Sequence, residues 1–377
     1  VTGCAHGGDR RLRWGDVMRK RDSSWVGAVG VLAMLVVGCR VEEPVAEVAD
    51  PPAPAADIGS GEAHLTNLRQ LTFGGQNAEA YYAFDGSRLI FQSTREGVPC
   101  DQIYTMELDG SDATMVSTGD GRTTCGYFFP GGESILYAST HLGGSECPPE
   151  PGSEMGYVWP VYDSYDIFTA NPDGSGLTRI TETDGYDAEA TIGPDGRVVF
   201  TSVRDGDMEI YSMNGDGSDL TRLTDRPGPD GGPFFSPDGS KIVFRAREIA
   251  PGPELDDFNT LLGQGLWRPT ALEIFVMDAD GGNLHQVTDM GDANFAPFWH
   301  PDGERIIFSS NSRDPEGRDF DLFMIHEDGT GLEQITFNNT FDGFPMFSPD
   351  GRHLVFASNR DAEVEGDTNV FIADWVE

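Results

Sequence analysis

The chain repeats itself from about Leu68 to its end, and this repetition constrains the fold more than any other feature. One stretch, "GGPFFSPDGSKIVFRA", recurs as "NFAPFWHPDGERIIFSS" and "DGFPMFSPDGRHLVFAS", with three weaker copies nearer the N-terminus. A second stretch of the type "IYSMNGDGSDLTRLT" follows five of these six copies. The sixth copy is followed only by "VFIADWVE".

Each repeated stretch has the pattern of a β-hairpin. Alternating apolar and β-branched residues flank an Asp-Gly pair, and the glycine supplies the positive φ that a tight turn needs. Two hairpins per repeat give four antiparallel strands. The sequence therefore predicts an all-β fold, a six-bladed β-propeller made of four-stranded antiparallel blades.

The segment "LRQLTF" at residues 68–73 resembles the last strand of a repeat, but no first hairpin precedes it. The sixth repeat has the opposite defect, because it lacks its last strand. Pairing the two would fill the open edge of the last blade. We therefore expect an N-terminal strand to complete the last blade and close the ring.

The motifs "FSPDG" followed by "IYSMNGDGSDLTRLT" resemble the WD40-like repeats of TolB-type propellers, over nearly all of residues 68–377. The resemblance implies a six-bladed propeller in the cell envelope that binds proteins or ligands. Some propellers of this type resemble pectate-fragment lyases with histidines clustered in the channel. In this chain, of the histidines after residue 39, only His300 falls on a predicted first strand.

The N-terminal region has the features of an export signal. Basic residues around Met18 precede an apolar run that ends in "VVGC" at Cys39. This ending resembles the lipobox of bacterial lipoproteins and implies a lipid on Cys39. The expected organisation is a signal peptide at 1–38 read from Met18, a disordered Pro/Ala/Glu-rich tether at 39–66, and a propeller at 67–377.

The chain is strongly acidic, with a formal net charge of −38 at pH 7. Such a charge repels nucleic acid and anionic lipid headgroups. The expected partners are an envelope protein or a small ligand at the propeller face, with membrane contact only through the lipid anchor. The expected location is the cell envelope, periplasmic or at the outer membrane or surface. A salt-adapted or merely solubilising surface is the alternative explanation of the charge.

Three cysteines remain after Cys39, and an exported protein can oxidise them. The sequence predicts one disulfide and leaves its pairing open among Cys100, Cys125 and Cys147.

Two long insertions fall between the second and third strands of blades 2 and 4, at about residues 141–165 and 248–271. Strand direction places both on the face opposite the Asp-Gly turns. They carry aromatic residues that could contact a partner, namely Tyr157, Trp159, Tyr162, Phe258 and Trp267.

Aligning the six repeats on their first turn places a side-chain oxygen at one position of every blade. These residues are Asn77, Thr123, Asp187, Asp230, Asn294 and Asp342. Glu79 and Glu189 stand two residues later in blades 1 and 3. We expect a ring of oxygens at the channel mouth, which could bind a partner or hold Ca²⁺ through Asp187, Asp230 and Asp342. The alternative is that these Asp and Asn residues only cap turns.

An arginine recurs two residues after a serine at the end of several second strands, as in Arg95, Arg204 and Arg360. Its repetition favours a structural ion pair. The chain lacks the G-x-S-x-G motif of serine hydrolases. The sequence thus favours a lipid-anchored scaffold that binds through its insertion-bearing face. The alternative is a channel enzyme, a lyase or hydrolase acting on an acidic saccharide or a similar small molecule.

Overall fold

The computed structural model describes residues 61–95, 97–314, 317 and 319–377. The predicted signal peptide, Cys39 and most of the predicted tether lie outside the described residues. The first described strand, β1, begins at Leu65, two residues before the predicted start of the propeller.

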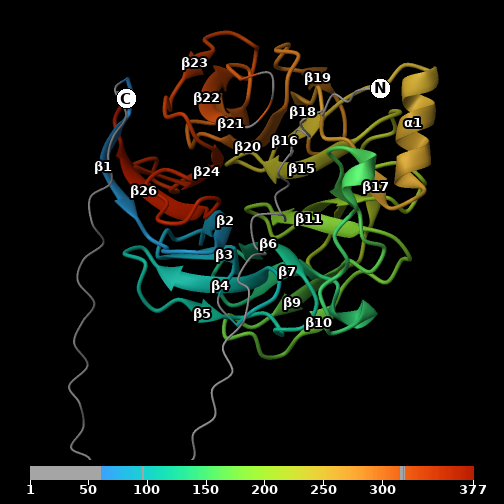
Figure 1. Ribbon diagram of the computed structural model, residues 1–377, viewed down its shortest axis with the longest axis horizontal. Coiled ribbons are helices and arrows are strands. Elements are labelled where there is room, and N and C mark those ends of the chain that lie inside the picture. Colours follow the sequence, from blue (N-terminus) through green and yellow to red (C-terminus); the bar gives the residue numbers. More distant parts are fainter. Residues whose placement is uncertain (1–60, 96, 315–316, 318) are drawn as a thin grey trace, which may run out of the picture. The chain divides into compact units, whose positions relative to one another are not determined.

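The described chain forms six four-stranded antiparallel sheets, as predicted (Figure 1). Blade 1 consists of β2 (Gln76–Tyr82), β3 (Arg88–Thr94), β4 (Gln102–Glu107) and β5 (Thr114–Met115). Blade 2 consists of β6 (Thr123–Phe128), β7 (Ile135–Ser139), β9 (Asp166–Ala170) and β10 (Thr178–Arg179). Blade 3 consists of β11 (Asp187–Ile192), β12 (Val198–Ser202), β13 (Glu209–Met213) and β14 (Thr221–Arg222). Blade 4 consists of β15 (Asp230–Phe235), β16 (Lys241–Ala246), β18 (Glu273–Asp278) and β19 (His285–Gln286). Blade 5 consists of β20 (Asn294–Trp299), β21 (Arg305–Ser310), β22 (Asp321–His326) and β23 (Glu333–Gln334). Blade 6 consists of β24 (Asp342–Phe347), β25 (His353–Ser358), β26 (Asn369–Trp375) and β1 (Leu65–Gln70).

The first strands of the blades form a ring. Each contacts the next in the order β2, β6, β11, β15, β20, β24 and back to β2. They are therefore the innermost strands, and the predicted six-bladed propeller is confirmed. Buried aliphatic and aromatic side chains of successive blades pack against one another between the sheets.

The last blade takes its fourth strand from the N-terminal side of the propeller. β1 pairs antiparallel with β26, and the sheet order is β1-β26-β25-β24 (Figure 1). Leu65 and Leu68 of β1 are buried against Phe356, Phe371 and other residues of the same blade. That this strand keeps the ring from opening stays a prediction.

The two predicted insertions meet each other. β8 (Trp159–Pro160) from blade 2 pairs antiparallel with β17 (Leu266–Trp267) from blade 4. We call these four residues the bridge. Helix α1 (Pro253–Leu262) precedes β17, starts with a proline in its first turn, and buries Phe258 and Leu261.

Short 3₁₀ turns at His141–Gly143 and Ser153–Met155 shape the blade 2 insertion. The two insertions share a buried cluster with Tyr186 and Met208 of blade 3, which lies between their own blades. The bridge is thus packed onto the propeller.

Every innermost strand contains the same β-bulge. Its pairing with the second strand of the blade shifts register within the first five residues. At each bulge one residue has a φ between 50° and 60°, although five of the six are not glycine: Glu79, Cys125, Glu189, Gly232, Ala296 and Phe344. The bulge turns the side chain of that residue out of the regular alternation of the strand.

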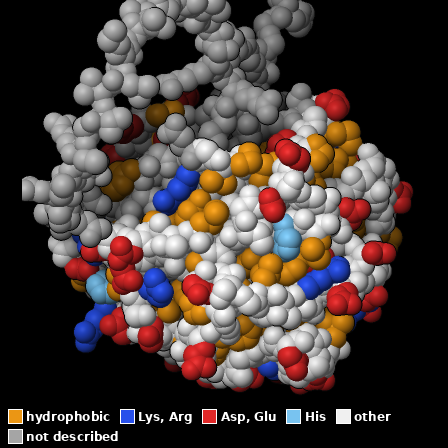
Figure 2. Space-filling model, turned by 90° about the horizontal axis from the view of Figure 1, so that it is seen from below, with side chains coloured by type: hydrophobic (Ala, Val, Ile, Leu, Met, Phe, Trp, Pro, Cys, Tyr) orange, Lys and Arg blue, Asp and Glu red, His pale blue; other side chains and the backbone are white. Residues whose placement is uncertain are grey.

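Acidic side chains are spread over the face shown in Figure 2, with fewer basic ones among them. Within the described part of the chain, no helix has the length and apolar character needed to cross a membrane.

Candidate functional site at the channel mouth

The six residues of the predicted oxygen ring occupy equivalent positions in the six blades. At these positions the chain joins neighbouring blades instead of lining the channel. The backbone N–H at this position donates to the carbonyl just before the third strand of the preceding blade. The donor–acceptor pairs are Asn77–Thr368, Thr123–Asp101, Asp187–Tyr165, Asp230–Met208, Asn294–Leu272 and Asp342–Phe320. All six side chains are buried. Of the six, only Thr123 borders the channel cavity described below.

Each carboxylate of this ring has an arginine partner within the protein, although Asp230 Oδ2 and Asp342 Oδ1 accept no hydrogen bond from a described residue. Asp187 accepts two hydrogen bonds from Arg204 at 2.8 and 2.9 Å. Asp342 pairs with Arg360 at 2.7 Å, and Asp230 pairs with Arg226 at 3.1 Å.

The amide nitrogens of Asn77 and Asn294 are also engaged, although Asn294 Oδ1 accepts no hydrogen bond from a described residue. The amide of Asn77 donates to the Thr368 carbonyl at 3.0 Å. Asn294 donates to the Leu272 carbonyl at 2.9 Å. The structure therefore does not bring Asp187, Asp230 and Asp342 together. Among the described residues no group of three or more His, Cys, Asp or Glu side chains could hold a metal ion. The proposed Ca²⁺ site remains an untested hypothesis.

The bulge residues, two positions further along each inner strand, are the ones that line the channel. All six border a cavity of about 260 Å³ at the mouth. Blades 1 to 3 contribute polar side chains to it, namely Glu79, Cys125 and Glu189. Blades 5 and 6 contribute Ala296 and Phe344. The bulge positions thus place polar side chains in blades 1 to 3 and apolar ones in blades 5 and 6.

The bridge borders the same cavity. Trp159, Pro160 and Tyr162 of the blade 2 insertion line it together with Phe295 of blade 5. Trp159 packs edge-to-face on Trp267 and on Phe295, with ring centroids 5.6 and 6.3 Å apart. The two insertions thus meet at the cavity wall.

The five predicted insertion aromatics have different environments. Tyr157 is 46% exposed, and Trp159 and Tyr162 are half-buried. Phe258 and Trp267 are only 5% and 2% exposed, because they form the buried contact between the insertions and the propeller. Phe258 packs beneath the bridge and Trp267 is part of it, and neither side chain presents a surface to a partner.

Glu189 has a complete set of partners in the cavity wall. Arg245 of β16 donates to its Oε1 at 2.6 Å. Thr201 and the Gly232 N–H donate to its Oε2 at 2.7 and 2.9 Å. Burial by itself would raise the pKa of Glu189, but the Arg245 guanidinium and these hydrogen bonds hold the pKa below its ordinary value. Glu189 is therefore ionised, and the positive charge of Arg245 balances its negative charge within the cavity wall.

Glu79 occupies the same bulge position in blade 1 without an arginine partner. Burial raises the pKa of Glu79 to about 7, and the charges of Glu189 and Asp101 act in the same direction. The Cys125 thiol donates to Glu79 Oε2 at 2.9 Å, which partly offsets this effect. Burial also raises the pKa of Cys125, so its sulfur keeps the proton it donates.

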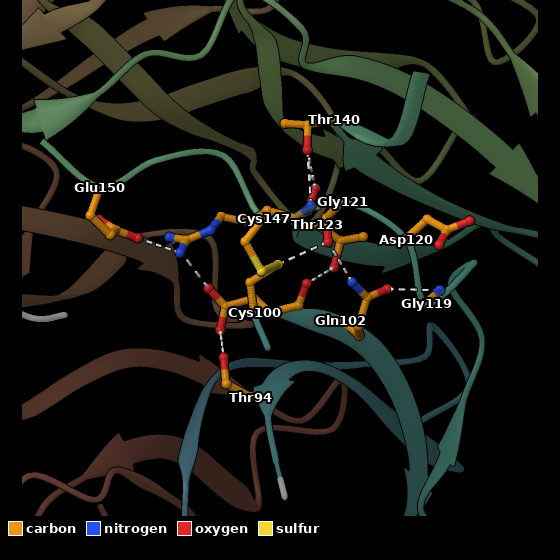
Figure 3. The surroundings of a disulfide bond; sticks show 12 residues. Thr94, Cys100, Gln102, Gly119, Asp120, Gly121, Thr123, Thr140, Cys147 and Glu150 are labelled. Atoms are coloured by element: carbon orange, nitrogen blue, oxygen red, sulfur yellow. Dashed lines mark hydrogen bonds and ion pairs between the residues drawn. A yellow bond between two sulfur atoms is a disulfide. The ribbon is translucent and has the colours of Figure 1, made fainter. Parts of the chain in front are cut away.

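A disulfide lies beside the cavity rim. Cys100 in the loop after β3 is bonded to Cys147 in the blade 2 insertion (Figure 3). Cys125 is free and buried. Arg122 lies next to the disulfide and pairs with Glu150 of the insertion and, at 4.0 Å, with Asp101. The disulfide thus fixes the insertion of blade 2 to blade 1, and Arg122 adds an ion pair to the same insertion.

Sequence reasoning identified Glu79 and Glu189 but missed Arg245, Tyr81 and Tyr186, which also line the cavity. One signal for Arg245 was available. A basic residue interrupts the apolar run "KIVFRA" of a predicted central strand, where a charge needs a buried partner.

Comparisons with known proteins agree with the observed architecture. The TolB beta propeller domain model matches residues 265–374. A protein of Agrobacterium tumefaciens assigned as TolB has a TM-score of 0.52 at 20% identity, covering 80% of this chain and 91% of that chain. TolB from Acinetobacter baumannii has a TM-score of 0.51 at 17% identity, covering 82% of this chain and 65% of that chain.

An oligogalacturonate lyase solved with manganese is similar to the same degree. Its TM-score is 0.51 at 16% identity, covering 87% of this chain and 97% of that chain. No curated protein sequence matches the chain. At these identities the structural likeness establishes the fold, which agrees with both a scaffold and an enzyme.

Proposed function

We propose that this TolB-like six-bladed propeller is a binding protein of the cell envelope that takes its ligand or partner at the insertion-bearing face. One observation carries the proposal: two insertions from non-adjacent blades pair as a bridge beside a cavity of about 260 Å³. Pockets that bind small molecules combine apolar and aromatic walls with a few converging polar groups. This cavity has both.

The channel-enzyme alternative receives less support from the geometry. His300, the histidine on which it depended, contacts Asp302 at 2.9 Å and Glu377 at 3.6 Å, beside the turn of blade 5. No histidine is among the described residues that line the cavity. The similarity to an oligogalacturonate lyase therefore rests on the fold.

Placement in the envelope rests on the signal-like N-terminus that ends at Cys39. A Cys39→Ser variant should lose lipid attachment and leave the membrane fraction or remain uncleaved, because the thiol carries the lipid. Fractionation of cells with mass analysis of the N-terminus measures this. A cleaved Cys39→Ser protein that stays with the membrane would overturn the assignment.

Recovery of bound molecules from envelope extract tests the binding role. Trp159→Ala removes the bridge side chain that borders the cavity, and Leu220→Ala removes an exposed side chain beside the turn before β14, on the opposite face. Molecules enriched with the parent protein should be lost with Trp159→Ala and kept with Leu220→Ala. Retention by both variants, or loss with Leu220→Ala alone, would contradict binding at the insertion face.

A further inference from the structure

The charges that line the cavity are paired except for one carboxyl group. Glu189 is neutralised by Arg245, and Arg122 lies between Asp101 and Glu150. Within the described residues, Glu79 is the acid of this lining for which no basic partner lies within ion-pair distance. Among the described residues, its polar contact is the neutral Cys125 thiol, at 2.9 Å.

Aromatic rings line the same cavity as this carboxyl group. Eight of them line the cavity: Tyr81, Trp159, Tyr162, Tyr165, Tyr186, Phe234, Phe295 and Phe344. Tyr81 and Tyr186 are more than nine-tenths buried, and no hydrogen bond joins their hydroxyl groups to another described residue. Aromatic faces attract cations, and the attraction is stronger where water is excluded.

We propose that this cavity binds an organic ammonium group carried on an apolar body, with the Glu79 carboxylate as its counter-ion and the aromatic rings as its walls. The proposal rests on the proposed binding function and adds the chemical class of the ligand. The ammonium N–H groups donate to Glu79 and to the Tyr81 and Tyr186 hydroxyls. The apolar body lies against Phe295, Ala296 and Phe344 on the other side of the cavity.

An anionic ligand fits the same cavity poorly. Both lining arginines already hold carboxylates, and the Arg245 guanidinium lies over the Trp159 and Trp267 rings, 6.0 and 5.5 Å from their centroids. Releasing Arg245 for a ligand would leave Glu189 buried without a partner. The formal net charge of −38 also attracts cations to the protein and repels anions.

Binding of this ligand is linked to proton release. The groups facing Glu79 are Cys125 on β6, Glu189 on β11, Arg245 on β16, Asp101 in the loop after β3, and Tyr81 on β2. Without ligand, burial raises the pKa of Glu79 to about 7, so the carboxyl is partly protonated at neutral pH. An ammonium ion favours the ionised form and draws the pKa down. Affinity should therefore be constant above pH 7 and fall by about tenfold per pH unit well below it.

Calorimetry with three probes of similar shape and different charge tests the proposal. The probes are 2-phenylethylammonium, 2-phenylethanol and 3-phenylpropanoate, measured at pH 8 and pH 5. We expect the cation to bind at least about tenfold more tightly than the alcohol at pH 8, as a charge-assisted hydrogen bond allows, and to lose this advantage at pH 5. A fourth probe, N-acetyl-lysine methylamide, carries the ammonium group of a protein side chain. Its affinity relative to that of 2-phenylethylammonium tells whether a lysine side chain or a free amine is the better ligand.

Two variants locate the effect. Glu79→Gln keeps the shape of the side chain and should make cation and alcohol bind equally. Glu133→Gln changes an exposed acid in a turn and should leave the preference unchanged. Melting of each variant shows that it is folded.

Equal binding of cation and alcohol by the parent, or tighter binding of 3-phenylpropanoate, would overturn the ammonium inference and leave the cavity as a binding site. An unchanged preference in Glu79→Gln would also overturn it. Failure of all four probes to bind would overturn it as well, and the Trp159→Ala recovery experiment would then decide the proposed function by itself.

Discussion

Buried arginines hold the carboxylates at the start of two inner strands by two kinds of contact at once. Arg204 donates to both oxygens of Asp187, while its guanidinium lies over the rings of Phe200 and Tyr211 at 5.3 and 4.9 Å. Arg360 donates to one oxygen of Asp342 at 2.7 Å, and its guanidinium lies over the ring of Phe356 at 5.1 Å. The structural ion pair that the recurring arginine indicated is present at these two positions, where it engages both oxygens of Asp187 and one oxygen of Asp342.

The position of the cavity residues could not be predicted from their types. The repeat register correctly aligned Glu79 with Glu189, but it could not show that this position, and not the one two residues earlier, faces the channel. The reason is the bulge in each inner strand. There Glu, Cys, Ala and Phe adopt a positive φ, which sequence-based reasoning expects only of Gly or Asn. Because these residue types share no turn chemistry, the bulge leaves no local sequence signal.

Arg245→Leu should destabilise the protein by roughly 3–5 kcal/mol at pH 8, because it leaves the Glu189 carboxylate buried without a cation. Since Arg245 holds the pKa of Glu189 low, that stabilisation is present above the unfolded pKa and is lost as pH falls through the folded one. The difference between variant and parent should therefore shrink at pH 4. Denaturant unfolding at both pH values measures it.

Arg88→Leu is the matched control, since Arg88 pairs with Glu107 at 3.5 Å on the surface. Such a pair contributes about 0–1 kcal/mol. If Arg245→Leu costs no more than Arg88→Leu, the ion pair does not support the cavity wall.

At the scale of single elements, the turn between the third and fourth strands is the recurring contact between blades. A glycine in this turn lies against a backbone carbonyl of the preceding blade. A β-carbon added at Gly174 would lie 2.4 Å from Val116 O, and one added at Gly217 would lie 2.5 Å from Ile180 O. Gly110 has the same contact with Leu71 O, just after β1, so the N-terminal segment meets blade 1 as a fourth strand would.

Gly217→Ala should destabilise the protein more than Gly196→Ala. Both glycines have a φ near +84°, so both variants carry the backbone strain of about 1–2 kcal/mol. Gly196 has no atom within 4 Å of the added carbon, whereas Gly217 would clash with the neighbouring blade. We expect an additional loss of about 1–3 kcal/mol for Gly217→Ala, measured by denaturant unfolding. Equal losses would show that the blades tolerate separation at this turn.

Leu68→Ala tests whether β1 belongs to the core of the last blade. Leu68 is buried among the residues of that blade, and truncation should cost about 2–5 kcal/mol. Phe73→Ala, a few residues later in the same segment, removes a side chain that is 63% exposed and should cost less than about 0.5 kcal/mol. Thermal unfolding of both variants measures this. A Leu68→Ala protein that melts with the parent would contradict ring closure by β1.

At the scale of the propeller, the repeats were sufficient to predict six blades, their strand number and the face that carries the insertions. They could not predict the bridge. Trp159 and Trp267 are 108 residues apart in the numbering and lie in insertions that share no pattern, so only the circular arrangement of the blades brings them together. The cavity depends on the bridge as well as on the inner strands, so the cavity could not be predicted from the sequence either.

The pKa of Glu79 is the measurement that bears most directly on the role of the channel mouth as a ligand site. Carbon NMR of the glutamate carboxyl groups gives it, with the Glu79 resonance identified by its disappearance in Glu79→Gln. We expect a pKa of about 7 in the free protein and a lower pKa with 2-phenylethylammonium bound. A pKa near the ordinary 4.5 that does not change with the amine would contradict a buried carboxyl group held ready for a cation.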